Sequence, residues 1–176
     1  GNLRESRINS NRADIIVISK CPKDLSNENK KQIISQIKPL PHQHLYFSYI
    51  NYGTPKQFHG VEKWNSTKHV LLVTGIVNPQ PLKAQLESQN KTVECFSFPD
   101  HHEYTVKDLL SITNFITKQE NNFVVATTSK DRVKLQELTS HIDTSFSFFE
   151  IPITIGFLFN EEDAFQKIVK SHVNRI

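Results

Sequence analysis

The chain has 176 residues, of which 37% are hydrophobic, and its formal net charge at pH 7 is +3. These values fit one globular domain, or a domain with a short appendage, and no apolar stretch approaches the roughly 18 residues that cross a bilayer. The even balance of basic and acidic residues argues against nucleic acid as a partner, and the two cysteines, Cys21 and Cys95, are too few for a disulfide scaffold.

The first predicted elements are a strand and a helix. Residues 13–19 (ADIIVIS) form a short, mostly β-branched apolar run, which is typical of a strand in a parallel sheet. Ser26 is placed to cap a helix over residues 27–37, and Pro39 ends that helix. Together they resemble the last strand and helix of a larger domain that lies upstream.

An aromatic segment comes next, from residue 45 to about residue 60. The extended run LYFSYINY, a turn around Gly53 and a second short extended piece predict a two-stranded antiparallel ribbon. Such a hairpin is marginally stable alone, so we expect it to pack against neighbouring layers or to bridge them.

The rest of the chain alternates strands and helices. We predict strands over residues 69–74, 93–98 and 123–127, helices over 81–89, 106–118 and 131–141, extended structure over 146–155, and a final helix capped by Asn160. This order predicts an α/β protein with a Rossmann-like three-layer α/β/α domain and a mostly parallel sheet. The ribbon and the first strand and helix precede that domain.

Three polar loops follow successive strands of this block, at residues 75–79, 99–102 and 127–131. Ligands of open α/β sheets gather beyond the carboxyl ends of the strands, so these loops are the candidate site. Structural roles are equally open at this point, because Gly75 can supply a positive φ and Asn78 can cap a helix.

Asp100 and His101 form the sharpest candidate pair. An imidazole titrates near neutrality and a carboxylate can orient it, so the pair suits general base catalysis. Adjacent residues on an extended loop tend to point apart, however, and we expect His102 to be a surface neighbour. The Asp-His-His triplet also occurs in manganese phosphoesterases, although no Asp-x-Asp pair is present to complete a two-metal site.

Other candidate residues are basic. Lys130 and Lys134 lie four apart at the start of a predicted helix, where they could meet a phosphate or form a solvated face. Lys20 follows the first strand in a loose match to the Asn-Lys-x-Asp element that holds a nucleotide base. The five glycines form neither a Gly-x-Gly-x-x-Gly run nor a phosphate-binding P-loop.

Several segments, taken in order, resemble the C-terminal part of the tetraacyldisaccharide 4'-kinase family, the lipid A 4'-kinases of Gram-negative bacteria. The matching pieces are Leu3-Arg4-Glu5, RADIIVISKCP from Arg12, GIVNPQPL from Gly75, FPDHHEYT from Phe98 and TTSKDRVK from Thr127. They span nearly the whole chain, and Ser6 departs from the proline that usually follows Leu-Arg-Glu. The absence of methionine and the start at Gly1 fit a processed or excised piece.

The resemblance implies two α/β/α domains joined by a two-stranded ribbon. Residues 1–42 would be the tail of the nucleotide-binding P-loop domain, residues 43–68 the ribbon linker, and residues 69–176 the C-terminal α/β domain. The family's Walker-type loop, its metal-binding acidic motif and its membrane-anchoring helix lie upstream of the Leu-Arg-Glu point. The resemblance therefore implies that this soluble fragment binds no cofactor, holds no metal and is inactive alone.

The same resemblance implies a reaction. The complete kinase transfers the γ-phosphoryl group of ATP, with Mg²⁺, to the 4'-hydroxyl of tetraacyldisaccharide 1-phosphate, a lipid A precursor. His101 matches the histidine that the family pairs with an aspartate of the P-loop domain, and Asp100 belongs to the same motif. Asn78, Lys130 and Lys134 are candidates for binding substrate or phosphate, and Lys20 for the nucleotide.

The implied location of the complete enzyme is the cytoplasmic face of the inner membrane, which it would meet through its N-terminal part. Its implied partners are the P-loop domain and the lipid disaccharide. Two alternatives stay open from the sequence: a metal-dependent phosphoesterase that uses Asp100, His101 and His102, and a binding module without chemistry.

Overall fold

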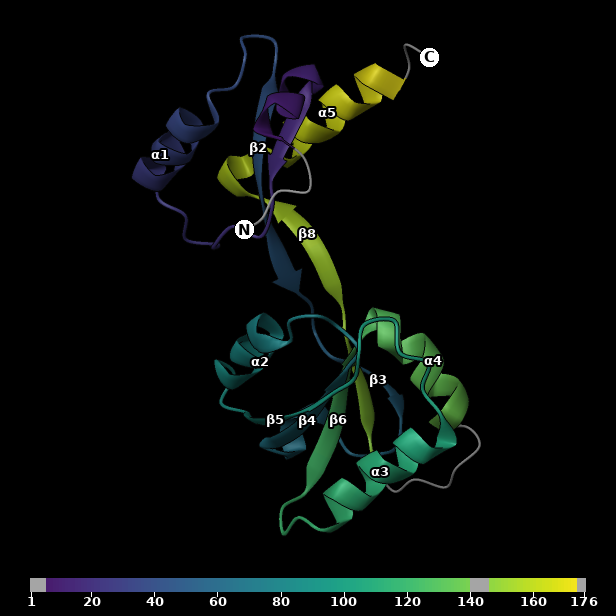
Figure 1. Ribbon diagram of the computed structural model, residues 1–176. Helices are drawn as coiled ribbons and strands as arrows, with labels where there is room; N and C mark the ends of the chain where they lie inside the picture. Colours follow the sequence, from purple (N-terminus) through teal and green to yellow (C-terminus); the bar gives the residue numbers. More distant parts are fainter. Residues whose placement is uncertain (1–5, 140–145, 174–176) are drawn as a thin grey trace. The chain divides into compact units, whose positions relative to one another are not determined.

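The structure is a computed structural model that describes residues 6–139 and 146–173, and the chain divides into two compact units (Figure 1). Residues 1–51 and 154–176 belong to the first unit, and residues 52–153 belong to the second. The predicted 69–176 domain therefore differs from the observed grouping, since the end of the chain returns to the first unit. The first matching piece of the sequence, Leu3 to Glu5, lies outside the described residues.

The first unit contains a three-stranded sheet in the order β1-β2-β8. Its strands are β1 (Ile15–Ile18), β2 (His44–Tyr52) and β8 (Ile153–Phe157), and its helices are α1 (Asn27–Ile37) and α5 (Glu162–Val173), with 3-10 turns η1 (Arg7–Arg12) and η3 (Leu158–Asn160). Strand β1 runs parallel to β2, as its apolar run predicts. The Ser26 cap of α1 is confirmed, because the Ser26 Oγ accepts a hydrogen bond from the Asn29 N–H at 3.2 Å.

Aromatic rings form the small core of the first unit. Phe47 is fully buried on β2, and its ring meets that of Phe159 edge-on at 5.9 Å between centroids. The Lys30 ammonium lies 3.8 Å from the centre of the Phe159 ring and pairs with Glu161 at 2.9 Å. These contacts hold α1 against the start of α5.

The second unit contains a five-stranded sheet in the order β3-β7-β6-β4-β5. Its strands are β3 (Lys56–His59), β4 (His69–Thr74), β5 (Thr92–Ser97), β6 (Phe123–Thr128) and β7 (Phe148–Ile151), and its helices are α2 (Gln80–Glu87), α3 (Val106–Thr117) and α4 (Ser129–Thr139), with a 3-10 turn η2 (Trp64–Ser66). Four strands are parallel and β3 is antiparallel to β7. The predicted mostly parallel sheet is confirmed.

Alternating side chains of the central strands make two hydrophobic cores, one on each face of this sheet. Leu71 and Val73 of β4 join residues of α3 and α4 in one core. Val70 and Leu72 join Leu82 of α2 in the other. Because successive side chains of a strand point to opposite faces, the continuous apolar run of β4 requires helices on both sides. The unit is therefore the expected three-layer α/β/α arrangement (Figure 1).

The predicted hairpin over residues 45–60 is wrong. Strand β2 lies between β1 and β8, whereas β3 pairs with β7 in the other sheet. The turn at Gly53 is not closed within the segment, because the Gly53 N–H donates to the carbonyl of Pro152 at 2.8 Å. The extended segment 146–155 is likewise two strands, which Pro152 separates, and each of them belongs to a different sheet.

Helix starts were predicted with mixed success. The capping box of α3 is confirmed by reciprocal hydrogen bonds between Thr105 and Asp108. Asn160 does not cap the final helix, since it lies in a 3-10 turn with φ 58° and α5 starts at Glu162. The predicted end of α4 at His141 lies outside the described residues. Over the part of the chain that the structure describes, no helix has the length and apolar character needed to cross a membrane.

Candidate active site

The strand order of the second unit reverses between β4 and β6, and the candidate site is built at the carboxyl ends of these strands. The chain passes from β4 to β5 on one side, and then to β6 and β7 on the other. Ligands of open α/β sheets bind at such a switch point. Gly75, directly after β4, and Thr128, at the end of β6, therefore lie where a ligand site is expected.

A buried carboxylate occupies this switch point. Asp131, in the first turn of α4, is only 2% exposed and accepts hydrogen bonds from the Gly75 N–H at 3.2 Å and the Thr128 hydroxyl at 2.8 Å. Burial raises the pKa of Tyr104, and the nearby Asp131 charge raises it further, so this hydroxyl stays protonated. Asp131 thus fixes the start of α4 to the end of β4.

The polar loop after β5 forms a tight turn. The His102 N–H donates to the Pro99 carbonyl at 3.2 Å, which places Asp100 and His101 at the two central positions. His101 has φ 61°, a left-handed conformation that glycine adopts without strain and other residues seldom adopt. Its side chain is 82% exposed and adds nothing to the core. Packing of the His101 side chain therefore does not explain the positive φ of this residue.

Asp100 lies between the Lys130 ammonium and the His101 imidazole. Its Oδ1 accepts a hydrogen bond from the Lys130 ammonium at 2.7 Å, and its Oδ2 lies 3.5 Å from the His101 Nε2. The Lys130 hydrogen bond is the main reason that the pKa of Asp100 lies below its usual range, and it outweighs the opposing effect of desolvation. The turn brings Asp100 and His101 together, contrary to the expectation that they point apart, because the segment bends instead of continuing as an extended loop.

His102 anchors the loop instead of lying on the surface as predicted. Its ring stacks on Phe98 at 4.6 Å between centroids, meets Tyr104 edge-on at 5.1 Å, and its Nε2 lies 3.1 Å from Asp108 Oδ2. The flanking aromatic residues were the sequence signal for this role. Within residues 6–139 and 146–173, no three His, Cys, Asp or Glu side chains are placed to hold a metal ion.

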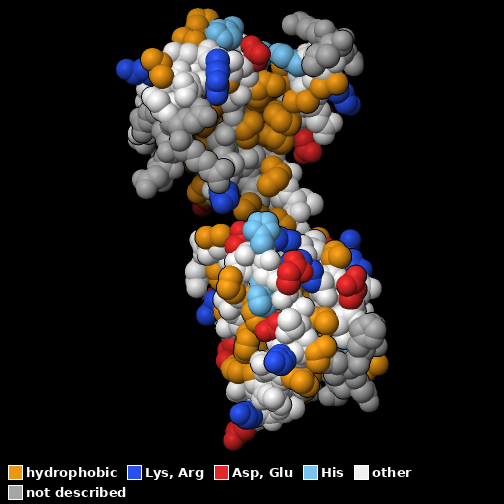
Figure 2. Space-filling model, turned by 45° about the vertical axis from the view of Figure 1, so that its right-hand side comes forward, with side chains coloured by type: hydrophobic (Ala, Val, Ile, Leu, Met, Phe, Trp, Pro, Cys, Tyr) orange, Lys and Arg blue, Asp and Glu red, His pale blue; other side chains and the backbone are white. Residues whose placement is uncertain are grey.

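Lys134 joins the same loop from α4. Its ammonium donates to the His102 carbonyl at 2.8 Å and pairs with the Glu103 carboxylate. Four predicted site residues thus come together: Asp100, His101, Lys130 and Lys134. Figure 2 shows histidine, acidic and basic side chains gathered on the surface of this unit.

Two predicted site residues are not part of this cluster. The Asn78 Oδ1 accepts a hydrogen bond from the Gln80 N–H at 3.1 Å, but the N-cap residue of α2 is Pro79 and not Asn78 as the sequence suggested. Lys20 belongs to the first unit, is exposed and has φ 59°. Their roles in binding phosphate or nucleotide stay predictions.

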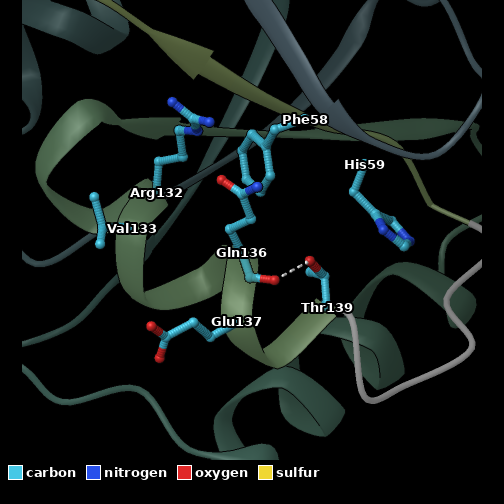
Figure 3. A pocket seen from close by; sticks show the side chains of 7 residues that line it. All are labelled: Phe58, His59, Arg132, Val133, Gln136, Glu137 and Thr139. Atoms are coloured by element: carbon cyan, nitrogen blue, oxygen red, sulfur yellow. Dashed lines mark hydrogen bonds between the residues drawn. The ribbon is translucent and has the colours of Figure 1, made fainter.

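A pocket of about 540 Å³ lies away from these residues, between β3 and α4 (Figure 3). Its lining includes Phe58 of β3 and Arg132 and Gln136 of α4, and the Arg132 guanidinium donates to Glu150 at 2.9 Å. None of the predicted site residues lines it, and we assign it no role.

Acid should weaken the anchor of the loop. Burial raises the pKa of Asp108, but hydrogen bonds from Thr105 and His102 outweigh burial and lower it. A carboxyl with a lowered folded-state pKa stabilises the fold above its unfolded value of about 3.9, and this stabilisation disappears as the pH falls through the folded pKa. We expect the free energy of unfolding of Asp108→Asn, from urea titrations at pH 7, 4 and 3, to fall less with acid than that of the original chain. Equal acid dependence in both proteins would contradict the assignment.

Comparison with known proteins identifies relatives of this chain. The family described as LpxK, tetraacyldisaccharide-1-P 4'-kinase, matches residues 1–174. A tetraacyldisaccharide 4'-kinase of Phocaeicola vulgatus is 30% identical over 99% of this chain and 50% of its own length, and that of Flavobacterium johnsoniae is 39% identical over 78% of this chain and 39% of its own length.

A solved structure is similar as well. The crystal structure of an "apo" form of LpxK from Aquifex aeolicus in complex with ATP matches 97% of this chain and 46% of that chain, with a TM-score of 0.52 and 20% identity. The chain spans about half the length of the curated relatives it matches. The match over residues 1–174 and the identity to curated kinases show that the chain belongs to the tetraacyldisaccharide 4'-kinase family.

Proposed function

We propose that this chain is the C-terminal portion of a kinase that uses ATP and Mg²⁺ to phosphorylate the 4'-hydroxyl of tetraacyldisaccharide 1-phosphate. The observation that carries the proposal is His101, 82% exposed on a strained turn and flanked by the ionised Asp100. Membership of the kinase family supports the reaction class. In this proposal His101 contributes to a site that another part of the polypeptide completes.

ATP phosphates and Mg²⁺ would be bound outside this chain. The five glycines form no phosphate-binding loop, and the described side chains gather no group of three potential metal ligands. The residues at hand therefore do not fit either group, and the proposal assigns both to an N-terminal part, within the half of the curated relatives' length that this chain does not span. The fragment alone would not turn over ATP.

The first unit has the features of an incomplete domain. None of the described residues of α1 and α5 is fully buried. Val17 on β1 is 41% exposed and Ile155 on β8 is 58% exposed, and hydrophobic side chains are visible on the surface of this unit in Figure 2. β1 is also an edge strand in the described sheet. These features support the proposal that further chain, the P-loop domain, covers this sheet.

The chemistry proposed for His101 follows from phosphoryl transfer. The substrate hydroxyl oxygen bonds to the γ-phosphorus of ATP. The bond from this phosphorus to the oxygen that bridges the β- and γ-phosphates breaks, and ADP leaves. The hydroxyl proton passes to a carboxylate of the P-loop domain. Such reactions depend on positioning and charge neutralisation. An exposed imidazole on a turn that is held at its backbone can orient that carboxylate or the hydroxyl.

The complete enzyme would act at the cytoplasmic face of the inner membrane, where its lipid substrate resides. Contact with the membrane would come from the N-terminal part, and the second unit would present His101 to the disaccharide headgroup.

An ATP-dependent phosphorylation assay on tetraacyldisaccharide 1-phosphate tests the proposal. We expect product from the complete polypeptide that contains residues 1–176 and none from residues 1–176 alone. Phosphoester hydrolysis by the isolated chain with Mn²⁺ would instead indicate the phosphoesterase. A folded but inactive complete polypeptide would indicate a binding module.

A further inference from the structure

We infer that Lys130 and Lys134 are positioning residues that hold the turn carrying His101, which we call the histidine turn (residues 99–103). The inference rests on the proposed function of His101 and assigns the two lysines a task other than binding a phosphate of the substrate.

The first turn of α4 is fixed to three strands. Asp131 accepts hydrogen bonds from the backbone after β4 and from Thr128 of β6, as described above. On the other side, the Ser129 hydroxyl donates to Glu150 of β7 at 2.6 Å, and Arg132 pairs with the same carboxylate at 2.9 Å. Asp131 and Glu150 are both buried, so these contacts are shielded from water. The start of α4 is therefore a rigid support.

Lys130 and Lys134 connect this support to the histidine turn. They lie one helical turn apart on the same face of α4. Lys130 bonds Asp100 on one side of His101, and Lys134 bonds the His102 carbonyl on the other. The two ammonium groups thus hold both neighbours of His101, the residue of the histidine turn that has a positive φ.

The contacts are poor candidates for a purely stabilising role. The Lys130 and Asp100 side chains are 41% and 40% exposed, and ion pairs of this kind contribute little to the free energy of unfolding. The two lysines are equally poor candidates for phosphate ligands, because each ammonium already has a carboxylate as a partner. Fixing the direction of the His101 side chain is the task that their geometry supports, and a misplacement of about 1 Å can cost a reaction about 100-fold.

Activity of the complete kinase distinguishes positioning from phosphate binding. We expect Lys130→Met to lower kcat about tenfold with little change in KM, and Lys130→Arg, which can still bond Asp100, to recover most of the loss. In a His101→Ala background, Lys130→Met should have little further effect, because the lysine acts through the imidazole. Lys134→Met should behave in the same way with a smaller loss.

Lys83→Met is the matched control, since Lys83 pairs with Glu87 on the exposed face of α2 at 3.7 Å and should leave turnover unchanged. A raised KM with unchanged kcat, or losses that multiply with that of His101→Ala, would show that Lys130 binds substrate and would overturn the inference.

A second measurement on residues 1–176 needs no activity. Amide NMR signals of residues 100–103 should shift and broaden in Lys130→Met and not in Lys83→Met, whereas signals of β4 and β6 should stay in place. Unchanged signals of the histidine turn would reject the inference by themselves. If the turn responds but His101→Ala leaves kcat intact, the role proposed for His101 fails while the support of the turn by α4 stands.

Discussion

Replacing His101 by alanine in the complete kinase is expected to lower kcat by about 10²- to 10⁴-fold, the usual range for the loss of a group that directs proton transfer. The fold should survive, because the side chain is 82% exposed and packs against no core residue. The measurement is steady-state phosphorylation of tetraacyldisaccharide 1-phosphate, with thermal unfolding of the same samples. The exposure of the imidazole and its place on a strained turn are the reasons for expecting a large effect on catalysis.

A matched control is His42→Ala, which removes another exposed imidazole and should leave turnover unchanged. If His101→Ala retains the original kcat, or if both variants lose activity together, His101 has no special role. A loss of activity that accompanies a lowered midpoint of thermal unfolding would show a structural effect instead.

Gly60→Ala is expected to lower the stability of the second unit strongly. Gly60 has φ 81°, and an added Cβ would lie 2.6 Å from the Ser147 Cα and 2.7 Å from the Phe146 carbonyl oxygen. Both neighbours are backbone atoms of the residues just before β7, so they cannot move aside as a flexible side chain would. Strain and overlap together should lower the free energy of unfolding by about 2–4 kcal/mol in urea titrations.

Gly53→Ala is the control for this substitution. The nearest atom to its added Cβ is the Pro152 Cβ at 3.3 Å, and Gly53 has no positive φ. We expect a change below about 1 kcal/mol. Equal effects of the two substitutions would show that the backbone around Gly60 relaxes and that β3 is less firmly placed beside β7 than described.

The sheet and helices of the second unit were predictable because local patterns and tertiary structure agree. Residues 70–73 of β4 are all apolar, so they indicate a strand that is covered on both sides, and Thr105 with Asp108 marks the start of a helix. The failed hairpin had a different cause. The partners of β2 and β3 are distant in sequence, and no local signal at Gly53 distinguishes a closed turn from a hydrogen bond to Pro152.

The residues of the candidate site were predictable from the sequence, but the contacts between them were not. Residue types and loop positions indicated Asp100, His101, Lys130 and Lys134, since the ends of parallel strands meet at one edge. The pairing of each lysine depends on where α4 starts relative to the turn, which only packing determines. Asp131 was missed as a buried residue because it lies between lysine and arginine in the sequence, where a charged residue is normally exposed.

The hydrogen bond from Gly53 to Pro152 bears on how the second unit was joined to the first and on how it can be exchanged. It joins the two points at which the chain enters and leaves the second unit, so that residues 52–153 begin and end side by side. A segment with adjacent ends has the topology of an insertion into a host domain, because it can be removed or exchanged without separating the strands that flank it. The second unit could accordingly be expressed by itself, cyclised head to tail, or transplanted between homologous kinases as a cassette.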